Sequence, residues 1–354
     1  MSFIKASSPH TTRPGTSNKV MQLVLLACVP GIIALSLNFG FGSLINLILC
    51  AAFCLGFEAA FLKLRARKVV FYLRDCSALV TAFLLAIALP PYAPWWLLAV
   101  GCFFAIVVAK QLYGGLGFNP FNPAMVAYVV LLISFPVEMT RWTLASSALA
   151  DGISLPSLSQ SLNLVFGNGH NSTLVDAWTA ATPLDVLKQN QGQTIDQLYQ
   201  SDAVFSSAVI AGAGWEWINI TFLAGGLFLL YKRVFTWQAP TAMLLALLAL
   251  SIVFYDGGSS DSLGSPVFHL LSGATMFGAF FIVTDPVTSA VSTKGRLIYG
   301  AGVGILVFVI RSWGIYPDAV AFAVLLMNFA APFIDYYTLP RTYGHKKANS
   351  GRIK

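Results

Sequence analysis

The chain has 354 residues, of which 57% are hydrophobic and only 10% are charged. A soluble domain normally carries about 25% charged residues, so this composition excludes a soluble enzyme, a coiled coil, a disordered regulator and a disulfide-rich scaffold. It predicts a protein that crosses the lipid bilayer several times. The net charge of +7 does not indicate a nucleic-acid partner, because the basic residues flank apolar stretches and form no patch with interleaved aromatic residues.

Ten apolar segments are candidates for membrane-spanning helices. In chain order they cover 20–37, 44–62, 77–91, 95–112, 123–136, 215–231, 238–254, 267–284, 297–312 and 318–335. The polar stretch after the fifth segment is rich in Ser, Asn, Gln and Asp, and loops of this length are usually functional or disordered. The chain therefore divides into an N-terminal segment, a first membrane unit, a long loop, a second membrane unit and a basic tail, at 1–19, 20–136, 137–214, 215–335 and 336–354.

The positions of the basic residues predict the orientation of these spans. If the N-terminus lies inside and the spans alternate, all but three of the 21 Lys and Arg residues fall on the inner side. The exceptions are Arg141, Lys188 and Arg311. Since Lys and Arg accumulate in short cytoplasmic loops, the sequence predicts that both termini are cytoplasmic and that the long loop faces outward.

Two pairs of segments indicate an internal repeat. Pro123–Leu132 (PAMVAYVVLL) matches Pro317–Leu326 (PDAVAFAVLL) at six of ten positions, 194 residues further along the chain. Ser77–Pro91 resembles Ser272–Pro286 more weakly, at an offset of 195. A repeat unit of five spans is odd, so its copies would lie in opposite orientations. We therefore expect an all-α membrane protein with about ten transmembrane helices in two inverted five-helix repeats.

Three segments interrupt the apolar pattern: GGLGFNPFNPA (114–124), LSGATMFG (271–278) and VTDPVTSA (283–290). Non-helical backbone at membrane depth persists only where it lines a cavity or is buried in protein. The sequence leaves open whether these segments line a functional cavity or only connect helices.

Ionisable residues inside apolar segments need an explanation, since their insertion costs free energy. Glu58 either reaches the basic boundary at 63–67 or belongs to an ion path. Asp285 either ends a helix through its Asp-Pro pair or belongs to such a path. Lys110 is expected to extend its ammonium group toward the inner surface.

Several motifs together resemble a known family. GGLGFNPFNPAM, LLSGAT, TDPVT, YPDAVAFAVLL and IDYYTLPRTYGH resemble the D subunits of Rnf-type (Rsx) ion-translocating electron-transport complexes and, more distantly, the B subunits of sodium-pumping NADH:quinone oxidoreductases. The resemblance covers essentially the whole chain and implies a fold similar to urea channels. It also implies a component of the bacterial inner membrane that passes electrons through flavins and is coupled to Na+ or H+ movement.

The resemblance further implies partners and a covalent cofactor. The partners are a flavin transferase and other flavin, iron–sulfur and NADH-binding subunits. The transferase joins FMN by its phosphate to a threonine in a pattern similar to Asp-x-x-[Ser/Thr]-Gly-Ala-Thr. Asp176, Thr179, Ala181 and Thr182 match this pattern, although Ala180 replaces its glycine.

A second stretch is similar to the same pattern. Ser272, Gly273, Ala274 and Thr275 keep the glycine but have His269 where the pattern has Asp. Because the transferase is expected to act on the outer face, Thr182 in the loop is the predicted attachment site, and Thr275 lies within a span. Trp178 would either stack on the flavin or anchor the loop at the membrane interface.

The resemblance also implies a second, non-covalent flavin. We expect riboflavin near Ser272–Thr275, Asn119, Asn122 and Asp285, although an ion path or helix packing through small residues would also suit them. The Cys and His spacings indicate no metal site, and no Gly-rich nucleotide loop is present. The chain is thus expected to be a relay that is not catalytic alone. A passive channel for a small polar solute on the same fold is the alternative function.

Overall fold

Long runs of apolar residues favour helices, because a helix satisfies its own backbone hydrogen bonds where water is absent. The computed structural model describes residues 17–149, 152–167, 178–190, 192–205, 208, 210–260, 262–316 and 318–338. Most of the predicted N-terminal segment and of the predicted basic tail therefore lies outside the described residues.

The first half of the chain forms a helical unit. Its elements are α1 (Ser17–Phe39), α2 (Gly42–Leu64), α3 (Val69–Leu73), α4 (Ser77–Ala88), α5 (Trp95–Phe103), the π-helix η1 (Phe104–Gln111) and α6 (Pro123–Ser134). The second half forms another unit. Its elements are α12 (Trp215–Tyr231), α13 (Gln238–Val253), α14 (Pro266–Leu271), α15 (Thr275–Phe277), the π-helix η5 (Gly278–Ile282), α16 (Thr293–Trp313) and α17 (Val320–Thr338).

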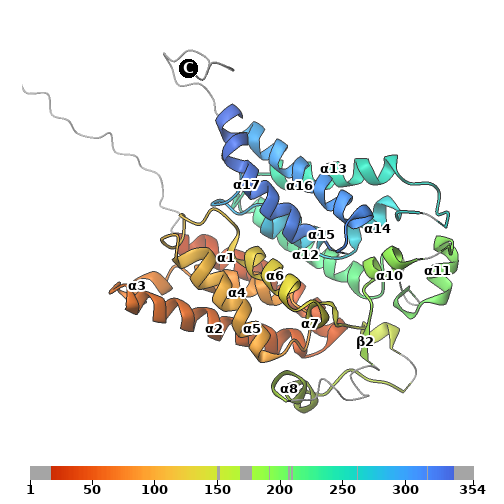
Figure 1. The fold of residues 1–354 in the computed structure, drawn as a ribbon, viewed down its shortest axis with the longest axis horizontal. Helices are drawn as coiled ribbons and strands as arrows, with labels where there is room; N and C mark the ends of the chain where they lie inside the picture. Colours follow the sequence, from red (N-terminus) through yellow and green to blue (C-terminus); the bar gives the residue numbers. More distant parts are fainter. Residues whose placement is uncertain are drawn as a thin grey trace, which may run out of the picture.

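The described part of the loop between the two units contains short elements. They are α7 (Pro136–Thr140), β1 (Trp142–Thr143), the 3-10 helix η2 (Ser146–Ala148), α8 (Leu158–Phe166), β2 (Thr179–Ala180), α10 (Pro183–Gln189), α11 (Ile195–Ser201) and the 3-10 helix η4 (Ala203–Phe205). In Figure 1, α8, α10 and α11 gather at one end of the long helices and α3 lies at the opposite end. This arrangement agrees with the prediction that the loop and the basic segment after α2 face opposite sides.

The predicted apolar segments are confirmed as helical. Among the described residues, four helices are long and apolar enough to cross a membrane: α1, α2, α16 and α17. The other predicted spans are shorter helices or helix series, and their crossing of the membrane stays a prediction. The three predicted interruptions are also confirmed, since the backbone is non-helical over 112–122, 272–274 and 283–292.

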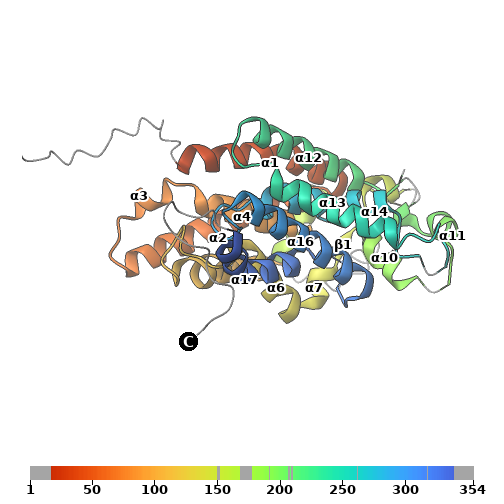
Figure 2. The same cartoon turned by 90° about the horizontal axis from the view of Figure 1, so that it is seen from above.

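The two units lie side by side and meet at two helix pairs. α1 packs against α12, and α6 packs against α17. Figure 2, turned by 90°, shows α1 beside α12 along one edge and α17 near α6 on the other side of the molecule. The space between these two contacts is where the functional candidates lie.

Small residues allow the closest helix crossings. A Cβ atom on Gly300 of α16 would lie 2.2 Å from the carbonyl oxygen of Ala239 in α13, and one on Gly304 would lie 2.3 Å from that of Met243. α12 approaches α1 in the same way, since a Cβ atom on Gly225 would lie 2.3 Å from the carbonyl oxygen of Ala27. Such contacts are typical of helices that associate within a bilayer.

This packing predicts the effect of a single methyl group. Gly300→Ala should destabilise the protein by about 1–3 kcal/mol, because the added carbon meets rigid backbone. Thermal unfolding in detergent should show a lower midpoint. Gly56→Ala is the matched control, because nothing lies within 4 Å of its added Cβ atom and alanine favours the helix. Equal midpoints for the two variants would contradict the close crossing.

Candidate functional site

A short strand pair attaches the loop to the helical units. β1 pairs antiparallel with β2, so that Trp142 lies opposite Ala180 and Thr143 opposite Thr179. The pairing continues where the Leu144 amide donates to the Trp178 carbonyl at 2.8 Å. The loop residues that resemble the attachment motif are thereby held at the end of the bundle.

Thr182 begins the helix that follows. Its hydroxyl group donates to Asp185 Oδ2 at 2.6 Å, and the Asp185 amide donates back to the Thr182 hydroxyl at 3.3 Å. The Thr182 amide also donates to Asp185 Oδ2, at 3.2 Å. This reciprocal arrangement is a capping box, and Pro183 at the first helical position needs no hydrogen-bond acceptor. Thr182 is half-buried, so its hydroxyl is held in place without being enclosed.

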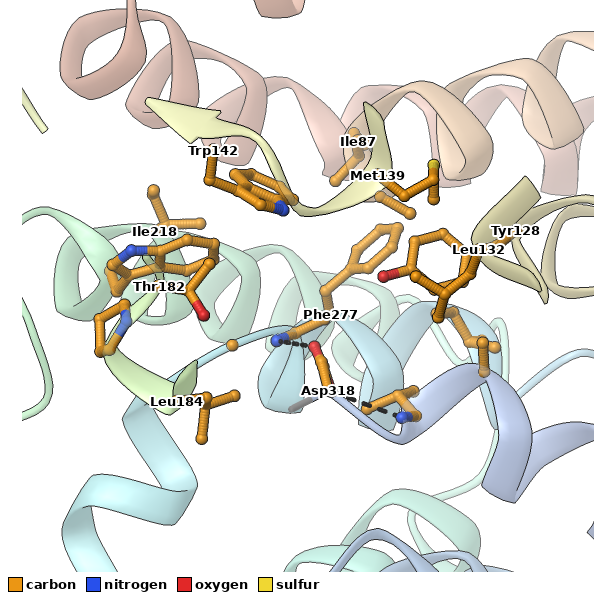
Figure 3. A pocket seen from close by; sticks show the side chains of 18 of the residues that line it. Ile87, Tyr128, Leu132, Met139, Trp142, Thr182, Leu184, Ile218, Phe277 and Asp318 are labelled. Atoms are coloured by element: carbon orange, nitrogen blue, oxygen red, sulfur yellow. Dashed lines mark hydrogen bonds between the residues drawn. The ribbon is translucent and has the colours of Figure 1, made fainter. Parts of the chain in front are cut away.

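The side chain of Thr182 lines a cavity between the two helical units, which we call the outer cavity. It has about 1020 Å³ of empty space, including its open side. Aromatic side chains form much of its wall, and its remaining lining is apolar apart from a few polar groups. The aromatic members that bear on the argument are Tyr128, Trp142, Trp215 and Phe277. Figure 3 shows the Thr182 hydroxyl near Trp142 and Leu184, across the cavity from Tyr128 and Leu132.

The Ser272–Thr275 turn forms another part of this wall. Gly273 and Ala274 line the outer cavity, and Gly273 has a φ of +57°, which glycine adopts without steric cost. The Ala274 amide donates to Asp318 Oδ2 at 2.9 Å, as the dashed line in Figure 3 marks. Arg311 holds the same carboxylate through its Nη2 atom, at 3.2 Å from Oδ1.

Ser272 and Thr275 point away from this cavity. Both are fully buried, and the Thr275 hydroxyl lies 2.8 Å from the His269 carbonyl oxygen and 2.9 Å from the Ser272 carbonyl oxygen. Thr182 and Thr275 therefore differ in accessibility: the first hydroxyl opens on a cavity, and the second is enclosed by the turn itself.

The other predicted residues line a second, inner cavity at the opposite end of the bundle, with about 850 Å³ of empty space including its open side. Asn119 and Asn122 are buried there, and the Asn122 side-chain amide lies 3.5 Å from Asp285 Oδ2. The Asp285 carboxylate also accepts hydrogen bonds from the Val287 amide and the Thr288 hydroxyl. Among the residues that the structure describes, the two cavities share no lining residue, so the residues expected around one second flavin are divided between two places.

The structure corrects the expectation for Lys110 and one of the two alternatives for Glu58. Lys110 does not reach the inner surface: it is 2% exposed and donates to Glu58 at 2.8 Å and to the Ser77 hydroxyl at 2.7 Å. Glu58, also 2% exposed, pairs with Lys110 and Gln111 and not with the basic boundary after α2. The sequence did not indicate this pair because its members lie 52 positions apart.

The other residues in and near the predicted attachment motif lie in different surroundings. Asp176 lies outside the described residues. Thr179 lies on β2 and Ala181 is exposed. Trp178 packs against Tyr92 and Leu164 and lines a small separate cavity, which supports its structural role rather than contact with the outer cavity.

Sequence reasoning missed several residues of the outer cavity. Trp142 and Trp215 contact each other with ring centres 5.1 Å apart, but nothing in the sequence joined the two ends of the loop. Asp185 was recognisable from the Thr-Pro-x-Asp capping pattern.

Lys188, on the same helix as Asp185, donates to the Tyr316 carbonyl at 2.8 Å. Burial lowers the pKa of the Lys188 ammonium group, and the nearby Asp185 carboxylate opposes this effect.

Comparison with known proteins identifies the relationship of this chain. Residues 4–344 match the sequence model described as the NQR2, RnfD, RnfE family. The chain belongs to this family. A relative from Cellvibrio japonicus, named as the D subunit of an ion-translocating oxidoreductase complex, is 58% identical, over 98% of this chain and 96% of the relative. Proteins of the same name from Ectopseudomonas mendocina and Vibrio atlanticus are 58% and 50% identical, over 98% or more of both chains.

Membership of the family and the four long apolar helices agree on the class of protein. The chain is an integral membrane protein. The match covers both helical units and the loop between them, so the two cavities lie within the family's common region.

Proposed function

We propose that this chain is the D subunit of an ion-translocating oxidoreductase complex of the bacterial inner membrane, and that it relays electrons through FMN attached to Thr182. The names of the relatives support the first part. The observation that carries the second part is the position of the Thr182 hydroxyl at the wall of the outer cavity. Flavin, iron–sulfur and NADH-binding subunits of the same complex would exchange electrons with this chain.

The outer cavity fits a flavin ring system. The walls offer Trp142, Trp215 and Phe277 for stacking, while Gly273 and Ala274 leave room for a flat ring to approach the turn. When bound, the flavin supplies the electron-transfer chemistry that no side chain of this protein provides.

The protein residues would position the cofactor and control its surroundings. Thr182 fixes one end through a covalent bond, so the cofactor does not dissociate during turnover. The aromatic and apolar wall would lower the polarity around the flavin, which strengthens electrostatic interactions inside the cavity. Asp318 holds the turn at Ala274 in place, because its carboxylate is itself fixed by Arg311.

The proposed architecture is ten transmembrane helices in two inverted repeats, similar to urea channels, with both termini in the cytoplasm. The order of helices supports it: the elements of the first half recur about 195 residues later in the second half. α1 then corresponds to α12 and α6 to α17, and these are the pairs that join the halves. Contacts between equivalent elements are those that a two-fold axis produces.

The inner cavity would hold a second ligand. Asn119, Asn122 and Asp285 would contact either riboflavin as a second flavin or the translocated Na+ or H+. The Ser272–Thr275 turn does not take part, because it belongs to the outer cavity. Two flavins per chain in purified protein would favour riboflavin, and one flavin would favour the ion path.

A fluorescence experiment on denaturing gels tests the attachment site. Wild type, Thr182→Val and Thr275→Val should be produced in cells that contain the flavin transferase. We expect a fluorescent band for wild type and Thr275→Val, and complete loss of the band for Thr182→Val, because valine has no hydroxyl to form the phosphoester. Loss of the band only with Thr275→Val would contradict the proposed site.

The alternative function is a passive channel for a small polar solute. The cavity between two similar helical units is compatible with it, since one fold serves many functions. A wild-type protein that carries no flavin in the presence of active transferase, and that conducts solute in liposomes, would favour this alternative.

A further inference from the structure

Three capping boxes occur in the described part of the loop, and one of them differs from the others in its chemistry. Ser157 pairs with Gln160, and Thr194 pairs with Gln197. Thr182 pairs with Asp185. A glutamine at the third helical position completes a capping box as well as an acidic residue does, but its amide cannot accept a proton from the hydroxyl.

The geometry of the Thr182 box suits proton transfer. The distance of 2.6 Å between Thr182 Oγ1 and Asp185 Oδ2 is in the range of hydrogen bonds from a hydroxyl to an ionised carboxylate. It also meets the requirement that a general base lie within about 2.6–3.2 Å of the group that it deprotonates. Both side chains line the outer cavity, so a reactant that reaches the hydroxyl also reaches the carboxylate.

We propose that Asp185 is the proton acceptor that activates Thr182 for covalent attachment of the flavin. The inference rests on the proposed function. The second reactant is a flavin dinucleotide delivered by the transferase. As Thr182 Oγ1 forms its bond to the phosphorus next to the flavin, the bond from that phosphorus to the bridging oxygen breaks and a nucleoside monophosphate leaves. The hydroxyl proton passes to Asp185 Oδ2 and from there to water.

The step has a close chemical precedent. In protein kinases an Asp carboxylate accepts the proton of a substrate hydroxyl during phosphoryl transfer. Here the acceptor protein would supply the carboxylate itself, three residues after the reacting hydroxyl. After attachment the Thr182 oxygen has no proton to donate, so its hydrogen bond to Asp185 Oδ2 is lost, while the two hydrogen bonds from the backbone amides do not depend on that proton.

Substitutions of Asp185 distinguish proton acceptance from simple helix capping. Asp185→Gln preserves a capping box of the kind that Thr194 and Gln197 form, but removes the proton acceptor. Asp185→Glu preserves both functions with a longer side chain. Gln197→Ala is the matched control, because it disturbs a capping box of the same loop that lies in another short helix.

The experiment measures the rate of attachment with the full-length purified protein. Protein made without transferase is mixed with purified transferase and flavin dinucleotide, and flavin fluorescence is followed on denaturing gels with mass spectrometry of the product. We expect Asp185→Gln to react at least about 100-fold more slowly, at an unchanged melting midpoint and unchanged transferase KM. Asp185→Glu should recover most of the rate, and Gln197→Ala should react as wild type does.

A wild-type rate for Asp185→Gln would overturn the inference and leave Asp185 as a helix cap, with the attachment at Thr182 intact. A lowered melting midpoint together with slow attachment in both Asp185→Gln and Gln197→Ala would also overturn it, since loop stability would then explain the rate. If the wild-type protein itself acquires no flavin, the proposed function fails. In the two outcomes above, by contrast, the wild-type protein is flavinylated, so the two failures are distinguishable.

Discussion

Lys110→Met is expected to destabilise the protein by about 3–5 kcal/mol, because it leaves the Glu58 carboxylate buried without its cation. The Lys110 ammonium group joins three helices: it lies in η1, contacts Glu58 of α2 at 2.8 Å and contacts Ser77 of α4 at 2.7 Å. Both charged side chains are only 2% exposed, so the Glu58 carboxylate left alone would be poorly solvated. Detergent-solubilised Lys110→Met should show a much lower melting midpoint and a smaller monodisperse fraction.

The double variant Glu58→Gln with Lys110→Met tests whether the charge is the cause. It should regain most of the lost stability, because neither side chain then buries an unpaired charge. Lys63→Met at the exposed end of α2 is the control and should melt as wild type does. If the double variant is as unstable as Lys110→Met, the loss comes from packing and the ion pair is not its origin.

Gly273→Ala is expected to have the second largest effect, because it combines backbone strain with a steric clash. A left-handed conformation costs alanine about 1–2 kcal/mol, and overpacking adds about 1–3 kcal/mol. The new Cβ atom would lie 2.7 Å from Leu184 Cδ1 and 3.0 Å from both Arg311 Nη2 and Asp318 Oδ2. We therefore expect a lower melting midpoint together with altered fluorescence of any flavin in the outer cavity.

Gly117→Ala provides the comparison that isolates the clash. Gly117 also has a positive φ, +90°, but nothing lies within 4 Å of an added Cβ atom. This variant should show only the backbone cost, with flavin fluorescence like that of wild type. Equal behaviour of the two variants would mean that the turn at Gly273 does not need the tight packing that the structure shows.

The sequence predicted the helices well and the site only in part. Apolar runs and their interruptions mark helices and breaks directly, because the cost of exposing backbone groups to lipid is a local property of each segment. The Ser-Gly-Ala-Thr motif marks the turn, but its sequence does not indicate which distant residues the turn contacts. The structure places Gly273 and Ala274 in the same cavity wall as Thr182, since the α14–α15 turn packs against α10, where a Cβ atom on Gly273 would lie 2.7 Å from Leu184 Cδ1.

The sequence by itself determined the membrane class and the helical segments, since both follow from composition and from the runs of apolar residues. The sidedness, which follows from charge, and the attachment threonine, which the family resemblance implies, stay predictions. Only the tertiary structure decided which distant groups meet. It paired Lys110 with Glu58, joined Trp142 to Trp215 and divided Asn119, Asn122 and Asp285 from the Ser272–Thr275 turn. These contacts depend on how closely helices cross, which is set by the shapes of side chains from both halves at once and is not encoded in any one segment.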